Sequence, residues 1–257
     1  MDETFRLVAA KVGGAPRTVR LTKSRDEREL HMNILFIGNS YTFFNKMPET
    51  LEALARSAGL DVTVMSVTKG GYTLEQLASD ENEHGARVSA MLMGDVKFDR
   101  IILQEQSVRP AASRDAFFGG VEAMLDKIHK YQAGAEVVLY ETWGRKAGHA
   151  VLAEHGWTTE EMYALLHESY SAAARKFGLR VSPVGAAFER VRRERPDIEL
   201  YANDLTHPSP EGSYLAACVH YAAVIGASPE NAAYCGDIDA GIAEYMRQVA
   251  REISLQK

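Results

Sequence analysis

The sequence has few of the residues that mark disulfide-rich or metal-binding proteins. Its 257 residues include two cysteines, and neither Cys218 nor Cys235 has a Cys-x-x-Cys neighbour of the kind found at zinc or redox sites. Cys218 lies in the apolar run 216–219, which predicts a buried thiol. The histidines lack the His-Glu-x-x-His spacing, and His149 and His155, six residues apart, are weak evidence for a metal. We therefore expect neither a disulfide framework nor a metal site.

Long apolar runs and an excess of positive charge are absent as well. No apolar stretch approaches the roughly 20 residues that cross a bilayer. The net charge of -6 argues against a nucleic-acid partner or an anionic membrane surface. The first residues, MDETFRLVAAKVGGAP, carry acidic side chains where a signal peptide is basic. These features predict a cytoplasmic protein with neither a membrane nor a nucleic-acid partner.

The composition is that of an ordinary globular protein, with 46% apolar and 25% charged residues. The length suits one sizeable α/β domain, which we place at residues 32–257. Residues 1–31 lie outside its pattern: two short apolar segments flank Gly-Gly-Ala-Pro, which reads as a hairpin arm or as a mis-assigned start. A homo-oligomer formed through this extension stays open.

From Met32 onward, strand and helix patterns alternate, which predicts a parallel sheet with helices on both faces. In such sheets, ligands bind beyond the carboxyl ends of the strands, where the strand order reverses. In helix 115–132, apolar residues at helical spacing are expected to be core: Phe118, Val121, Met124, Leu125 and Ile128. The expected strands are 33–37, 61–67, 99–103, 135–140 and 179–182. The expected helices are 47–58, 85–94, 115–132, 159–177, 185–194, 210–226 and 239–253.

Two separated motifs carry the chemistry. Gly38-Asn39-Ser40 directly follows the first apolar run, and Asp204-Leu205-Thr206-His207 lies near the C-terminus. A serine hydroxyl is a poor nucleophile unless an adjacent base takes its proton and a third group orients that base. Ser209 and Pro210 are typical of a helix start, which fixes His207 on a short loop three residues after Asp204. The motifs predict a Ser40–His207–Asp204 triad.

Together these motifs resemble the SGNH (GDSL-like) hydrolase family over residues 32 to about 253. Gly38-Asn39-Ser40 stands in the place of the family's Gly-Asp-Ser block, and Asp204 and His207 match its Asp-x-x-His block in spacing. Gly71-Tyr72-Thr73 matches the glycine block after the second strand. The resemblance implies a three-layer α/β/α fold of flavodoxin-like type with a central parallel five-stranded sheet.

The third block departs from the family pattern. Where the family has Gly-x-Asn-Asp after the third strand, this chain has Gln104-Glu105-Gln106-Ser107. The resemblance implies an oxyanion hole made of the Ser40 and Gly71 N–H groups and the Gln106 amide, on a stem one methylene longer than asparagine. Whether Gln106 or Gln104 completes the hole stays open, and Gln104 and Glu105 can equally be structural.

Polar and aromatic residues are expected around the rim of the site. Trp143 and Arg145 follow the fourth strand, and an exposed indole there would suit a sugar ring while the arginine would grip an acidic group; a core-packing tryptophan is an equal alternative. Tyr72 is the third expected substrate-binding residue. Three aromatic residues near the nucleophile would line the pocket or pack beneath it: Tyr41, Phe43 and Phe44.

The resemblance implies a serine esterase that acts through an acyl-enzyme and needs no cofactor. The polar rim (Tyr72, Arg109, Trp143 and Arg145) and the lack of a long apolar lid favour a short acyl group, acetyl above all, on a small molecule or carbohydrate. The alternatives are a lipase or thioesterase of the same fold, and a non-catalytic ligand-binding protein with a degenerate oxyanion hole. The altered third block favours the last of these.

Overall fold

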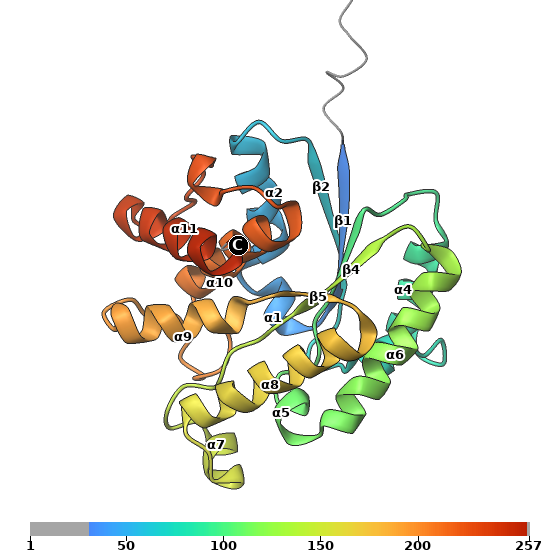
Figure 1. Ribbon diagram of the computed structural model, residues 1–257, viewed down its shortest axis with the longest axis horizontal. Helices are drawn as coiled ribbons and strands as arrows, with labels where there is room; N and C mark the ends of the chain where they lie inside the picture. The colour runs from blue at the N-terminus through green and yellow to red at the C-terminus, as the bar shows by residue number, and fades with distance from the viewer. Residues whose placement is uncertain (1–30, 256–257) are drawn as a thin grey trace, which may run out of the picture. The chain divides into compact units, whose positions relative to one another are not determined.

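The protein is described by a computed structural model over residues 31–255, and it is built on one five-stranded sheet. All neighbouring strands are parallel, in the order β2-β1-β3-β4-β5 (Figure 1). Every expected strand is present to within one residue at each end. The extension expected at residues 1–31 falls, apart from His31, outside the described residues. The strands are β1 (Met32–Gly38), β2 (Val62–Thr68), β3 (Arg100–Leu103), β4 (Glu136–Tyr140) and β5 (Arg180–Ser182).

The interior strand β1 supplies core side chains to both faces of the sheet. Its residues Ile34, Leu35, Phe36 and Ile37 are all fully buried. Because side chains alternate along a strand, Ile34 and Phe36 join one hydrophobic core while Leu35 and Ile37 join the other. The near-continuous apolar run is thus explained by burial on two sides, as is usual in parallel sheets.

Helices cover both faces and complete a three-layer α/β/α fold (Figure 1). One layer consists of α2 (Met47–Ser57), α9 (Val184–Glu194), α10 (Pro210–His220) with the π-helical segment η3 (Tyr221–Ile225), and α11 (Ala240–Ser254). The other consists of α3 (Leu74–Ala78), α4 (Glu83–Met93), α6 (Arg114–Tyr131) and α8 (Thr159–Phe177).

The sequence pattern missed the shortest helices. Between four and six residues give too little periodicity to recognise. In α6 the core assignment needs one correction, because Phe117 is fully buried while Phe118 is only partly so and lies against Phe177. Cys218 is fully buried, as predicted. The short helices are α1 (Ser40–Phe43), α3, α5 (Arg109–Ala112) and α7 (Ala150–His155), beside the 3₁₀ turns η2 (Phe44–Lys46) and η4 (Pro229–Asn231).

The strand order places a switch point at β1, since β2 lies on one side of it and β3 on the other. Chain segments leaving these three strands therefore meet at one edge of the sheet. None of the helices among residues 31–255 is long and apolar enough to span a membrane.

Candidate active site

The nucleophile turn between β1 and α1 leaves no room for a side chain at its first residue. A Cβ on Gly38 would lie 2.6 Å from Thr42 Oγ1 and 2.8 Å from Gln104 Oε1. The Asn39 N–H donates to the same Gln104 oxygen at 2.8 Å. Glycine is therefore required for a close approach of backbone to Gln104, and this contact directs the chain so that Ser40 starts α1.

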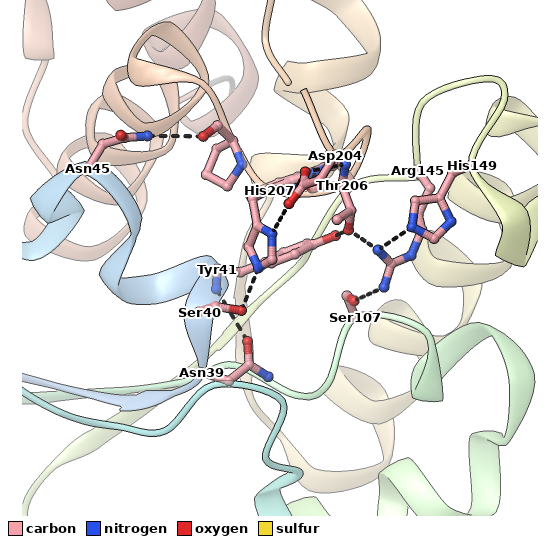
Figure 2. A network of polar contacts seen from close by, with 12 residues as sticks. Asn39, Ser40, Tyr41, Asn45, Ser107, Arg145, His149, Asp204, Thr206 and His207 are labelled. Atoms are coloured by element: carbon pink, nitrogen blue, oxygen red, sulfur yellow. Dashed lines mark hydrogen bonds and ion pairs between the residues drawn. The ribbon is translucent and has the colours of Figure 1, made fainter. Parts of the chain in front are cut away.

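Ser40, His207 and Asp204 form one continuous chain of hydrogen bonds (Figure 2). His207 Nδ1 lies 2.5 Å from Asp204 Oδ2, and His207 Nε2 lies 2.8 Å from Ser40 Oγ. A carboxylate only accepts, so Nδ1 carries a proton and Nε2 is left as the acceptor for the Ser40 hydroxyl. The expected distance between nucleophile and base is met across 167 positions of sequence.

The loop from Asp204 to His207 is folded around the carboxylate. Asp204 Oδ1 accepts the N–H groups of Thr206 at 3.0 Å and His207 at 2.9 Å, which leaves Oδ2 for the imidazole. Partial burial acts to raise the pKa of Asp204. The hydrogen bonds from the His207 ring and from the two N–H groups outweigh it, so this pKa lies below its usual value. The carboxylate is therefore ionised at neutral pH and can stabilise an imidazolium.

Aromatic side chains fix the plane of the imidazole. The Phe44 ring stacks on His207 with centroids 4.0 Å apart and planes 9° apart, and Tyr41 meets the imidazole edge-on at 5.7 Å. On the C-terminal side, Ser209 caps α10 through the Gly212 N–H at 3.0 Å, with Pro210 at the first helical position as predicted.

Left-handed backbone conformations concentrate at the site. Among residues 31–255, the non-glycine residues with positive φ are Asn45 (49°), Lys46 (56°) and Leu205 (63°). Asn45 and Lys46 follow the nucleophile helix, and Leu205 lies inside the triad loop. Such conformations are strained and persist only where the surroundings hold them, commonly at functional sites. Here the Asn45 amide donates to Pro208 O at 3.0 Å and to Ser213 Oγ at 2.9 Å, joining the Ser40 segment to the His207 segment.

The glycine block forms a tight turn beside the nucleophile. The Tyr72 N–H donates to Lys69 O at 3.2 Å across Gly70 and Gly71, and Gly71 has φ +76°. A positive φ at this turn position favours glycine. The Asn39 side chain donates to Tyr72 O at 3.0 Å and so ties the turn to the nucleophile. The Gly71 N–H donates to no group within the described chain.

Searches with the sequence against protein-family models and against curated proteins found no match. Solved structures do match. A candidate SGNH hydrolase from Slackia heliotrinireducens is 35% identical, with a TM-score of 0.63 over 74% of this chain and 97% of its own. At that identity and coverage, the similarity decides the family. The chain belongs to the SGNH hydrolase superfamily.

More distant structures share the SGNH fold. A DUF4886 family protein from Bacteroides uniformis matches with a TM-score of 0.74 and 19% identity, over 88% of this chain and 95% of its own. An acetyl xylan esterase matches with a TM-score of 0.57 and 13% identity, over 75% of this chain and its whole length. At these identities the similarity concerns the fold.

The altered third SGNH block contains two glutamines in different environments. Gln104 is fully buried: its Oε1 accepts from Asn39 N–H and the Thr42 hydroxyl, and its Nε2 donates to Glu105 O. Gln106 is partly exposed, and its Oε1 accepts the N–H groups of Val108 at 2.9 Å and Arg109 at 3.0 Å. Two backbone donors fix which end of the Gln106 amide is oxygen, so its NH₂ faces away from α5.

Among residues 31–255 that NH₂ donates to no other protein group. Gln104 is thus committed to supporting the nucleophile turn. Gln106 keeps a free donor, in accord with its position as the third-block residue of the SGNH pattern. Its role as an oxyanion donor stays a prediction.

Of the two alternatives for Trp143, the exposed indole of a sugar-binding rim is wrong and the core-packing tryptophan is confirmed. Only 1% of it is exposed. It stacks between the Tyr41 ring at 4.4 Å and the Phe188 ring at 4.0 Å, and its Nε1–H donates to Thr206 O at 3.1 Å. Burial of so large a ring next to the triad loop is favourable because the indole N–H finds a partner. Trp143 therefore packs beneath the triad loop as a structural support, through its contacts with Tyr41 and Thr206.

Arg145 is buried beside the triad loop, with 8% of the residue exposed (Figure 2). Its guanidinium donates to the hydroxyls of Thr206 and, at 2.9 Å, Ser107, and lies 3.3 Å from His149 Nε2. Thr206 also bonds the Tyr41 hydroxyl at 2.7 Å. Arg145 thus joins the loops after β3 and β4 to the triad loop, an arrangement for which the sequence offers no signal.

Tyr72 is partly exposed beside the glycine turn, with its ring against His84. The roles of Tyr72 and Arg145 in substrate binding stay predictions. A cluster of three or more His, Cys, Asp or Glu side chains able to hold a metal is not found among residues 31–255.

Proposed function

We propose that this SGNH hydrolase cleaves a short-chain carboxylic ester, an acetyl ester above all, through an acyl-enzyme on Ser40. The observation that carries the proposal is the unbroken Ser40–His207–Asp204 hydrogen-bond chain. The coarser class, an ester hydrolase of the esterase and lipase type, accords with the family.

The reaction begins with transfer of the Ser40 proton to His207 Nε2 as Ser40 Oγ attacks the ester carbonyl carbon. Asp204 holds the imidazole in the required tautomer and balances its positive charge. The tetrahedral oxyanion would be stabilised by the N–H groups of Ser40 and Gly71 and by the Gln106 NH₂. His207 then returns the proton to the leaving alcohol, and a water molecule reverses the sequence to free the acid.

A small acyl group is supported by an aromatic side chain that lies beside the glycine turn. Phe43, 41% exposed and three residues after Ser40, has its ring tip 4.0 Å from the position of a Cβ on Gly70. We infer that this ring limits the room for a long acyl chain beside the glycine turn. A carbohydrate as the alcohol part of the ester is less well supported, because Trp143 is buried and does not lie at the rim of the site. The fold of an acetyl xylan esterase is compatible with it.

The alternatives predict different results. A lipase or thioesterase would prefer long acyl chains, and a non-catalytic binding protein would turn over nothing. The altered third block favours the latter.

The test is a series of p-nitrophenyl esters from acetate to palmitate, assayed with wild type, Ser40→Ala and Ser113→Ala. Ser113 is a suitable control because it is exposed and its side chain makes no capping bond. We expect acetate to be the best substrate, Ser40→Ala to be inactive and Ser113→Ala to match wild type. If turnover were highest with long acyl chains, the protein would be a lipase or thioesterase rather than an acetylesterase. If no ester were turned over and a fluorophosphonate did not label Ser40, the non-catalytic binding protein would be the remaining alternative.

A further inference from the structure

We propose that Glu105 is a positioning residue for the oxyanion side of the site. Its ionised carboxylate holds the loop of Gly71 and the loop of Gln106 at a fixed distance from each other. The inference rests on the proposed ester hydrolysis for its catalytic consequence. Its structural part concerns one buried side chain and the two loops it joins.

A single oxygen of Glu105 links the second and third SGNH blocks. Oε1 accepts the Leu74 N–H at 3.1 Å and the Gln106 N–H at 2.6 Å. Leu74 begins α3 directly after the glycine turn, and Gln106 carries the candidate amide donor. Since backbone N–H groups bind a charged acceptor more strongly than a neutral one, the carboxylate fixes the distance between the two loops.

The second oxygen of Glu105 is buried and has no hydrogen-bond partner among residues 31–255. Helix α6 packs against this oxygen at Gly120. A Cβ added to Gly120 would lie only 3.0 Å from Glu105 Oε2 and 3.2 Å from the Leu74 Cβ. A buried carboxylate oxygen without a partner is costly in its charged form. A group whose only role was to pack there would be better served by an apolar residue.

The charged and titratable groups around Glu105 do not neutralise it. Arg109 on α5 is the nearby cation, but it pairs with Glu75 of α3 at 2.5 Å, and the Tyr170 phenol lies on α8. Burial raises the pKa of Glu105 to about 7, against the opposing effect of the hydrogen bonds from Gln106 and Leu74 and the charge of Arg109. Both protonation states are therefore populated near neutral pH.

Protonation has opposite consequences for the fold and for the site. The folded state holds this proton more tightly than the unfolded chain, in which the glutamate pKa is near 4.5. Protonated Glu105 therefore favours folding at low pH, and this contribution to stability is lost as the pH rises towards 7. The ionised form is nevertheless the better acceptor for Leu74 and Gln106. Alignment of the oxyanion donors should thus improve with rising pH through the range in which the fold loses stability.

The decisive variant is Glu105→Gln, which keeps an acceptor oxygen but cannot ionise. The matched control is Glu52→Gln on α2, because Glu52 is a partly buried carboxylate that also accepts a backbone N–H, that of Val64 at 3.0 Å, and its charged partner is an arginine, Arg56, rather than a histidine. The quantity measured is the ratio of wild-type to variant kcat for p-nitrophenyl acetate between pH 5.5 and 8.5.

For Glu105→Gln we expect the ratio to rise from near one at pH 5.5 to about ten at pH 8.5, with KM little changed, as for an interaction used in the transition state. Glu52→Gln should give a ratio that does not vary with pH. A ratio for Glu105→Gln that is flat, or that follows the control, would overturn the proposal and leave Glu105 a packing residue.

A second measurement does not need catalysis. Hydrogen exchange of the Leu74 amide in wild type, expressed as a protection factor, should increase from pH 6 to pH 8, and this increase should be absent in Glu105→Gln. Constant protection in wild type would overturn the proposal even if Glu105→Gln failed to fold. If wild type hydrolysed no ester, the proposed function would fail while this measurement still decided whether Glu105 holds the two loops.

Discussion

The two halves of the site are assembled by different means. On the acid–base half, Ser40, His207 and Asp204 bond directly to one another through their side chains. On the oxyanion half, the candidate donors of Ser40, Gly71 and Gln106 do not touch. Their loops are aligned instead by buried polar side chains that face the backbone: Asn39, Gln104 and Glu105. The first half depends on direct bonds between a few side chains, and the second on buried supporting residues.

This contrast predicts where single substitutions will be severe. Loss of a reacting side chain should abolish chemistry in a folded protein. Loss of a supporting side chain should give a smaller effect on kcat, accompanied by a change in stability, because a buried donor or acceptor is left without a partner.

The largest effect is expected for Asp204→Asn. The amide cannot hold the imidazole in the required tautomer or balance its charge, so kcat should fall by about 10⁴-fold with the fold intact. Steady-state kinetics with p-nitrophenyl acetate and a thermal melt measure both. Turnover near that of wild type would mean that another carboxylate, or none, orients His207.

Gln106→Ala probes the oxyanion half directly and should lower kcat by about 10²–10³-fold with KM little changed. Gln104→Ala is its counterpart among supporting residues. It orphans the buried Asn39 N–H and Thr42 hydroxyl, so it should lower the free energy of unfolding by about 1–3 kcal/mol with a milder effect on kcat. If Gln104 proved critical for kcat and Gln106 dispensable, the alignment of the third block would be shifted by two residues.

Asn39→Asp restores the family's Gly-Asp-Ser block but should make this enzyme worse. A carboxylate can still accept the Tyr41 N–H, yet it cannot donate to Tyr72 O as the Asn39 amide does at 3.0 Å. The glycine turn would lose its tether, and kcat should fall by about tenfold, the effect of one hydrogen bond. Activity equal to or above wild type would show that the Asn39–Tyr72 bond does not position Gly71.

The smallest effect concerns the strained turn that joins the two triad segments. Asn45→Gly and Lys46→Gly each relieve a left-handed backbone, worth about 1 kcal/mol, but only Asn45→Gly removes the bonds to Pro208 and Ser213. We expect Lys46→Gly to keep kcat and gain stability, and Asn45→Gly to lose several-fold in kcat. Equal kcat in the two variants would mean that the Asn45 amide does not hold His207 in place.

Much of the fold and the acid–base half could be predicted from local signals. Most of the five strands lie in short runs of aliphatic or β-branched residues. Asp204 and His207 lie three residues apart on a loop that ends at a Ser–Pro helix start, so their proximity is set by the covalent chain between them. The parallel topology then brings the loop of Ser40 to the same edge of the sheet. Resemblance to the SGNH family supplied the pairing of these two distant segments.

What the sequence alone determined is therefore the set of candidate reacting side chains, because their chemistry and short-range spacing are properties of the chain. Tertiary structure alone decided which neighbours are supports. It buried Trp143 between Tyr41 and Phe188, committed Gln104 to the nucleophile turn, and placed Glu105 under two loops from different strands. Burial and the direction of a hydrogen bond depend on residues that are distant in sequence and close in space, and no local pattern records them.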